Sequence, residues 1–176
     1  EIKNNKLMER VHPCLVDNTS YISKIDGVLN AIIIDGQPIG RSVLQGEGAG
    51  PGATTSALIS DLCSILRGKN KYPFGVSFNS RKKIAKFNIL KHKCSAYIRI
   101  QVKDKPGVLS SITKIFANNR ISIKNLIQTP NKKKHLASIA IITHQNLEVN
   151  FMNLLSNLTK NKFVIRKPTF IRIEQV

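Results

Sequence analysis

The segment Ile98–Gln128, IRIQVKDKPGVLSSITKIFANNRISIKNLIQ, decides the fold expected for the second half of the chain. Around its start, apolar residues alternate with polar ones, which is typical of a half-buried strand. These apolar residues are Ala96, Ile98, Ile100 and Val102. Asp104–Leu109 then opens a helix, with Pro106 in the first turn. A second strand is expected over 121–129.

The sequence after this segment continues the same pattern. A lysine-rich turn is expected at 132–134, followed by a strand over 136–143, a helix over 147–158 and a last strand over 164–173. The second half of the chain therefore predicts the β-α-β-β-α-β order of a ferredoxin-like fold. The chain as a whole is expected to belong to the α+β class.

Residues 1–68 predict a smaller set of elements. A short strand is expected over 11–16. The β-branched run 27–36 ends in Asp-Gly, a turn signal, and 38–45 is expected to form the return strand of a hairpin. Residues 53–67 predict a helix whose apolar face is buried.

Between the hairpin and this helix, glycine occupies four alternate positions, Gly46, Gly48, Gly50 and Gly52. No Lys-Ser/Thr pair follows, which argues against a P-loop. Gly48-x-Gly50-x-x-Ala53 loosely matches a dinucleotide fingerprint, but no acidic residue follows about 20 positions later. Two interpretations stay open: backbone amides that approach a phosphate or the edge of a cofactor, or a tight crossover from strand to helix.

The net charge of +18 is unevenly distributed. Residues 1–68 carry a net charge of −1, residues 69–93 +8 and residues 94–176 +11. These shifts predict boundaries near residues 68 and 93, with a basic linker between them. Basic surfaces attract nucleic acid. The chain is also rich in Lys, Asn and Ile, however, which an A/T-biased genome would enrich, and we prefer this second explanation.

An RNA-recognition module, which can share this order of strands and helices, is disfavoured. Such modules stack bases on aromatic residues of two central strands, the first and the third. Here the expected third strand has no aromatic residue, and the first offers only Tyr97.

Other kinds of site find little support. Cys14, Cys63 and Cys94 are far apart and form no metal-binding motif, so we expect reduced, buried thiols rather than a zinc site or a disulfide. The four histidines share no motif, and no catalytic triad or paired-carboxylate site can be identified. No stretch reaches the roughly 18–20 apolar residues of a membrane span, and no signal peptide is visible. Because the chain opens abruptly without Met, a fragment of a longer protein is expected.

Three segments together carry a family resemblance: GVLNAIIIDG (27–36), VLQGEGAGPGATTSALISDL (43–62) and the segment quoted first. In this order they resemble the C-terminal part of bacterial homoserine dehydrogenase, and the last resembles its appended ACT domain. The resemblance implies three parts. These are the C-terminal remainder of the catalytic region (1–68), a basic linker (69–93) and an ACT regulatory domain (94–176).

The resemblance implies an NAD(P)-dependent oxidoreductase that interconverts L-homoserine and L-aspartate 4-semialdehyde, on the route to threonine, methionine and isoleucine. Gly50 aligns with the cofactor-contacting glycine of the family, and Gly48 and Glu47 are its expected neighbours at the nicotinamide end. The Rossmann half and the catalytic lysine are absent from this chain. We therefore assign it no catalytic residue and no metal, and expect the fragment alone to be inactive. The helix over 53–67 is also expected to have lost the sheet that it would cover, which leaves an apolar face exposed for pairing with another copy.

For the ACT part, the resemblance implies feedback sensing of an amino acid, with threonine the expected effector. The expected effector-binding residues are Asp104, Gly107, Asn125 and Gln128. Pairing of ACT domains implies a homo-oligomer such as a dimer, and the enzyme is expected in the cytoplasm without a membrane partner. Two alternatives stay open: a free-standing amino-acid-binding ACT module, and a basic nucleic-acid-binding protein.

Overall fold

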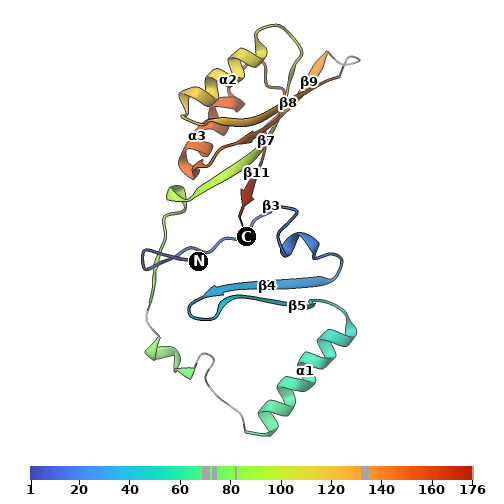
Figure 1. The fold of residues 1–176 in the computed structure, drawn as a ribbon, viewed down its shortest axis with the longest axis vertical. Helices are drawn as coiled ribbons and strands as arrows, with labels where there is room; N and C mark the ends of the chain where they lie inside the picture. The colour runs from blue at the N-terminus through green and yellow to red at the C-terminus, as the bar shows by residue number, and fades with distance from the viewer. Residues whose placement is uncertain (69–71, 73–74, 82, 132–134, 176) are drawn as a thin grey trace. The chain divides into compact units, whose positions relative to one another are not determined.

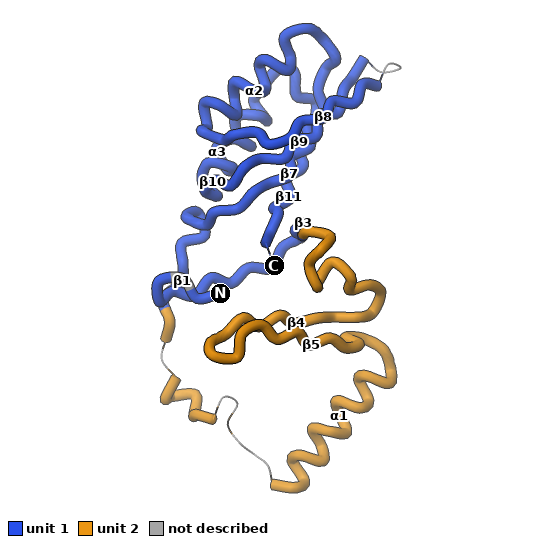
Figure 2. Tube along the Cα trace, viewed as in Figure 1, with its two compact units in different colours: residues 1–16, 85–175 blue, residues 17–84, 176 orange. Residues whose placement is uncertain are grey.

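A computed structural model describes residues 1–68, 72, 75–81, 83–131 and 135–175. They divide into two compact units (Figure 2). Unit 1 combines Glu1–Val16 with Ala85–Gln175, and unit 2 is Asp17–Ile84. This division differs from the boundaries expected near residues 68 and 93, because the N-terminal segment packs with the C-terminal part of the chain.

Unit 1 contains the six elements expected for the second half of the chain. They are β7 (Lys93–Lys103), α2 (Val108–Asn118), β8 (Ile123–Asn131), β9 (Leu136–Thr143), α3 (Glu148–Thr159) and β11 (Thr169–Glu174). Shorter elements complete the unit. They are β1 (Ile2–Lys3), β2 (Lys6–Leu7), β3 (Cys14–Val16), β6 (Ala85–Lys86), the 3-10 helix η4 (Ile89–Lys91) and β10 (Asn146–Leu147).

The main sheet of unit 1 has the strand order β3-β11-β7-β9-β8, and β10 also pairs with β7. The pair β3–β11 is parallel, whereas the other pairs of this sheet are antiparallel. Helices α2 and α3 cover one face of the sheet (Figure 1). The α+β class and the β-α-β-β-α-β order predicted from the sequence are confirmed.

The core of unit 1 lies between the two helices and the sheet. Along β7 the alternate residues from Cys94 to Val102 are buried, as the sequence alternation predicts. Each helix contributes an apolar stripe at helical spacing. These residues are Val108, Ile112 and Phe116 from α2, and Phe151, Leu154 and Leu158 from α3.

Three elements of unit 1 begin later than predicted, beside a proline or glycine that accounts for the difference, and β8 is shifted by two residues from the predicted 121–129. Helix α2 begins at Val108 rather than at Pro106, because Gly107 has a φ of +82° and acts as the N-cap. The last strand begins at Thr169, just after Pro168, whose ring nitrogen cannot donate to a sheet ladder. Likewise β3 begins only after Pro13. The predicted turn at 132–134 lies outside the described residues.

Unit 2 consists of a hairpin followed by a long helix. Its elements are the 3-10 helix η1 (Ile22–Lys24), β4 (Leu29–Gly36), β5 (Gly40–Glu47), α1 (Pro51–Leu66) and the 3-10 helix η3 (Phe78–Ser80). The predicted hairpin and helix are confirmed. Strands β4 and β5 pair along their whole length, and Arg41 Nε donates to Asp35 Oδ1 across the hairpin at 2.7 Å.

The burial of the α1 apolar face that periodicity predicts is wrong, whereas the exposed face expected from the missing sheet is observed. No residue of α1 is buried, and Leu62 and Leu66 are 51% and 77% exposed. Periodicity identifies an apolar face but not the surface that covers it, and no described part of this chain does so.

The expectation of three buried thiols is also only partly met. Cys94 is buried and Cys63 half-buried, but Cys14 is exposed. None of the helices that the structure describes has the length and apolar character to cross a membrane.

Because α3 contributes buried residues and α1 does not, the same Leu→Ala substitution should destabilise the fold more in α3 than in α1. The side chain of Leu154 has no exposed surface, so Leu154→Ala leaves a cavity in the core. The change should lower the free energy of unfolding by about 2–5 kcal/mol. Leu62→Ala should lower it by less than about 1 kcal/mol. Urea denaturation followed by circular dichroism measures both, and equal losses would contradict this packing.

Candidate functional site

The glycine loop between β5 and α1 is the first candidate site. Gly50 is the N-cap of α1, with φ +118° and ψ 157°, a conformation that L side chains rarely adopt. A Cβ added at Gly50 would meet no atom within 4 Å, so its surroundings are open. Pro51 occupies the first helical position, and the Thr54 amide donates to the Gly50 carbonyl at 3.1 Å.

The requirement for glycine at position 48 has a different cause. A Cβ on Gly48 would overlap the side-chain amide of Asn30, which lies against it. The Gly48 amide also donates to the Val28 carbonyl at 3.0 Å, which closes the end of the hairpin. Glu47, the last residue of β5, is paired with Leu29. Gly48 therefore fits the neighbouring strand, whereas Gly50 leaves backbone open to a ligand.

The charge of this loop limits what it can hold. From Leu44 to Leu66 the sequence has no Lys or Arg, and its acidic residues are Glu47 and Asp61. Phosphate groups are usually held by cations as well as amides. The loop suits an uncharged or positively charged end of a cofactor better than its phosphates.

The start of α2 is the second candidate site, and here two predicted residues meet. Gln128 Nε2 on β8 lies 3.5 Å from Asp104 Oδ1 in the loop before the helix. The Asp104 amide donates to the carbonyl of His135 at 2.9 Å, which fixes this loop. Gly107 is the N-cap at the same end of α2. The first-turn amides of a helix can bind a carboxylate, so this corner presents groups suited to both ends of an amino acid.

The fourth predicted effector residue, Asn125, lies elsewhere. It is directly opposite Ile142 on β9, whereas Gln128 is opposite Ile139. Ile139 is fully buried on the face that the helices cover, and its neighbours along β9 point to the other face. The structure therefore places Asn125 on the uncovered face of the sheet, away from Asp104 and Gln128.

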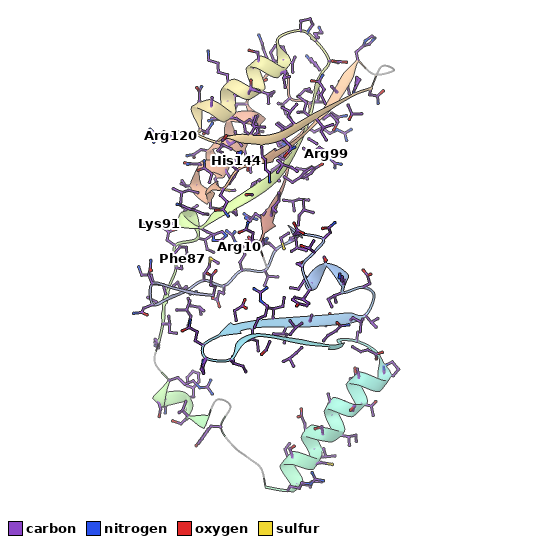
Figure 3. All side chains as sticks on the ribbon, viewed as in Figure 1. Arg10, Phe87, Lys91, Arg99, Arg120 and His144 are labelled. Atoms are coloured by element: carbon purple, nitrogen blue, oxygen red, sulfur yellow. The ribbon has the colours of Figure 1, made fainter. Side chains whose placement is uncertain are left out.

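A buried charged cluster is the feature that sequence analysis missed. Glu148, at the start of α3, is only 2% exposed. Its carboxylate accepts hydrogen bonds from Arg172 Nε on β11 at 3.0 Å and from Arg10 Nη1 at 3.3 Å. Figure 3 labels Arg10, which precedes β3. We call Glu148, Arg172, Arg10 and the adjacent Cys94 the Glu148 cluster.

The cluster perturbs the titration of its members. Burial on its own would raise the pKa of Glu148, but the hydrogen bonds and charges of Arg172 and Arg10 hold that pKa below its usual value. Burial, with the nearby Glu148 carboxylate, raises the pKa of the Cys94 thiol to about 12. Such a thiol stays protonated and unreactive at neutral pH, which indicates a structural role. Among the described residues, no group of three or more His, Cys, Asp or Glu side chains could hold a metal ion.

The Glu148 cluster predicts an acid-sensitive fold. Because the pKa of Glu148 is lower in the folded chain, its contribution is complete above the ordinary carboxyl value of about 4.3 and is lost as pH falls through the folded-state pKa. Glu148→Gln leaves the half-buried Arg172 without its charged partner and should cost up to about 3–5 kcal/mol at pH 7. The variant should also lose less stability than wild type on acidification.

Urea titrations at pH 7 and pH 3 measure both effects. Glu9→Gln, at an exposed position, is the matched control and should be near neutral. Equal stability of Glu148→Gln and wild type at pH 7 would rule out the proposed contribution of the cluster.

Comparison with known proteins matches both parts of the chain. The family model for homoserine dehydrogenase matches residues 3–63, and that for the ACT domain matches residues 96–148. A curated homoserine dehydrogenase from Helicobacter pylori is 36% identical over 165 residues, which cover 94% of this chain and 39% of that protein. One from Bacillus subtilis is 29% identical over 175 residues, which cover 97% of this chain and 40% of that protein.

A solved structure of a homoserine dehydrogenase from Thiobacillus denitrificans gives the same result. It has a TM-score of 0.82 and 28% sequence identity, and the match covers 99% of this chain and 40% of that chain. This chain thus spans about 40% of the length of the relatives it matches. Over nearly its whole length it corresponds to the C-terminal part of homoserine dehydrogenases, a piece of the catalytic region followed by an ACT domain.

Proposed function

We propose that this chain is the C-terminal part of an NAD(P)-dependent homoserine dehydrogenase, which interconverts L-homoserine and L-aspartate 4-semialdehyde. The proposal rests on the sequence similarity to the H. pylori enzyme over 94% of this chain. Two local features agree with it: the positive φ of Gly50 at the start of α1, and the corner formed by Asp104, Gln128 and the start of α2. The product of this reaction leads to threonine, methionine and isoleucine.

In this proposal the glycine loop contributes to cofactor binding but not to the chemistry. The dinucleotide supplies hydride transfer when bound. Gly50 brings open backbone to its nicotinamide end, and Gly48 and Glu47 hold the loop against the hairpin. The lack of Lys and Arg between Leu44 and Leu66 in the sequence agrees with a position away from the phosphates. The groups that orient homoserine and move its proton belong to the region before this chain, so the fragment alone should not turn over substrate.

The ACT part would sense an amino acid, and L-threonine is the effector that we propose. The first-turn amides of α2 suit its carboxylate, the Asp104 carboxylate suits its ammonium group, and Gln128 can donate to or accept from its hydroxyl. Asn125 lies on the uncovered face of the sheet, away from Gln128. It would therefore belong to such a site only if it came from a second copy of the chain. Within the described residues β8 pairs with β9 alone, and its free edge could support pairing of ACT domains in a homo-oligomer such as a dimer.

The setting of the enzyme follows from its chemistry. We place it in the cytoplasm, where the exposed thiol of Cys14 would stay reduced. A free-standing ACT module is the alternative function. It is less favoured because the homoserine dehydrogenase model matches residues 3–63, which an ACT module does not need.

A chimera tests the catalytic proposal. The part of the H. pylori enzyme that precedes its match to this chain is joined to residues 1–176. The chimera should reduce L-aspartate 4-semialdehyde with NADH or NADPH, and the 176-residue chain alone should not. An inactive, folded chimera would count against the catalytic proposal, as would activity of the chain alone.

The same chimera tests the glycine loop. Gly50→Ala forces a side chain into a strained conformation that costs about 1–3 kcal/mol, so the KM for the coenzyme should rise about tenfold. Gly52→Ala is the matched control, because its backbone is helical and the space around it is open. A coenzyme KM that is unchanged in Gly50→Ala would remove this loop from the cofactor site.

Calorimetric titration of the 176-residue chain with L-threonine tests the sensing proposal. Saturable binding is expected, weakened more than tenfold by Gln128→Ala through loss of a buried polar contact in the complex. The exposed Gln145→Ala is the matched control and should bind as wild type does. Binding that tolerates Gln128→Ala would place the effector elsewhere.

A further inference from the structure

The uncovered face of the unit 1 sheet contains a cavity that neither the catalytic nor the sensing proposal uses. Its volume is about 340 Å³, within the usual size range of small-molecule sites. Six residues line it: Arg99, Gln101, Ser138, Arg166, Lys167 and Thr169. All six side chains can donate hydrogen bonds, and three of them are cations.

The floor of the cavity is set by strand register. Arg99 on β7 is directly opposite Thr169 on β11, and Gln101 is directly opposite Ser138 on β9. Directly opposite residues of an antiparallel pair project from the same face. Ile98 and Ile100, which alternate with them, are fully buried under the helices, so Arg99 and Gln101 project from the opposite face. Arg99 is labelled in Figure 3.

One wall of the cavity is a short irregular segment that leads into β11. It is held to β7 at Val164, which forms an isolated bridge with Val102, and at Ile165, whose amide donates to the Gln101 carbonyl at 2.9 Å. Pro168, which is buried, ends the segment. Arg166 and Lys167 lie between these anchors, so they are held beside Arg99 by fixed backbone.

The three cations have no counter-charge in the described structure. The side chains of Arg99, Arg166 and Lys167 form no salt bridge or hydrogen bond with any described residue. The part after residue 93 has only three acidic residues, and each is engaged elsewhere. Glu148 accepts from two arginines, Asp104 contacts Gln128, and Glu174 lies 3.6 Å from Nε2 of His92. Like charges gathered in one cavity repel, and a bound anion relieves that repulsion.

We propose that this cavity binds a small organic phosphate. An arginine fork matches two phosphate oxygens at once, and lysine adds a point charge. Gln101, Ser138 and Thr169 supply neutral donors to the remaining oxygens. A neighbouring cavity of about 470 Å³ shares Gln101 and Ser138 and includes Pro130 and Leu136, which gives space for an organic group. The site lies on the face opposite Gln128, so it is separate from the proposed amino-acid site.

Calorimetric titration of the 176-residue chain in about 150 mM NaCl, where exposed charges are screened beyond about 8 Å, tests the proposal. The probes are 5′-AMP, as an organic phosphate, and inorganic phosphate. We expect saturable binding of one 5′-AMP, tighter than that of inorganic phosphate. Arg99→Gln and Arg166→Gln should each weaken it at least tenfold. Both positions are exposed, so the variants should fold, which circular dichroism checks.

Lys114→Gln and Lys160→Gln are the matched controls, because they remove exposed charges outside the cavity and should change binding less than twofold. Equal weakening by the controls, or no saturable binding, would overturn the proposal. If inorganic phosphate binds as tightly as 5′-AMP, the proposal that the cavity recognises an organic group beside the phosphate is overturned. Single-stranded RNA that binds through Arg99 and Arg166 while 5′-AMP does not would assign the cavity to nucleic acid instead.

Discussion

The assembly of unit 1 depends on the hydrogen bonds that the buried carboxylate of Glu148 accepts. These bonds join Arg10, near the start of the chain, to Arg172, near its end. The backbone amide of Glu148 also donates to the His92 carbonyl at 2.8 Å. The parallel pairing of β3 with β11 begins at Arg172. A segment from the part that matches homoserine dehydrogenase therefore becomes an edge strand of the ACT sheet. Because a buried charge is costly without its partners, loss of either arginine should destabilise this junction.

Much of the fold could be predicted because its signals are local. The alternation along β7, the helical stripes of α2 and α3 and the hairpin of β4 and β5 all follow from neighbouring residues. The predicted boundaries failed where one residue changed the backbone, as at Gly107 and Pro168. Periodicity alone predicted a buried face on α1, whereas its exposure follows from the resemblance, which implies that the sheet this helix would cover is missing from this chain.

The candidate sites were less predictable because they depend on distant residues. Gly50 was assigned from the family resemblance rather than from its spacing, and its φ of +118° agrees with a backbone path that only glycine adopts readily. The separation of Asn125 from Gln128 could have been anticipated, because residues three apart on a strand project from opposite faces. The Glu148 cluster had no sequence signal, because Arg10 and Glu148 lie 138 positions apart.

Unit 1, with its N-terminal strand β3, holds its own buried core, whereas no described residue buries the apolar face of α1. Hydrogen–deuterium exchange on the 176-residue chain and on the chimera tests this difference most directly. In the isolated chain, amides of α1 should exchange far faster than those of α2, α3 and β7, because α1 has no buried residue. In the chimera, α1 should become protected. Equal protection of α1 and α3 in the isolated chain would contradict the account.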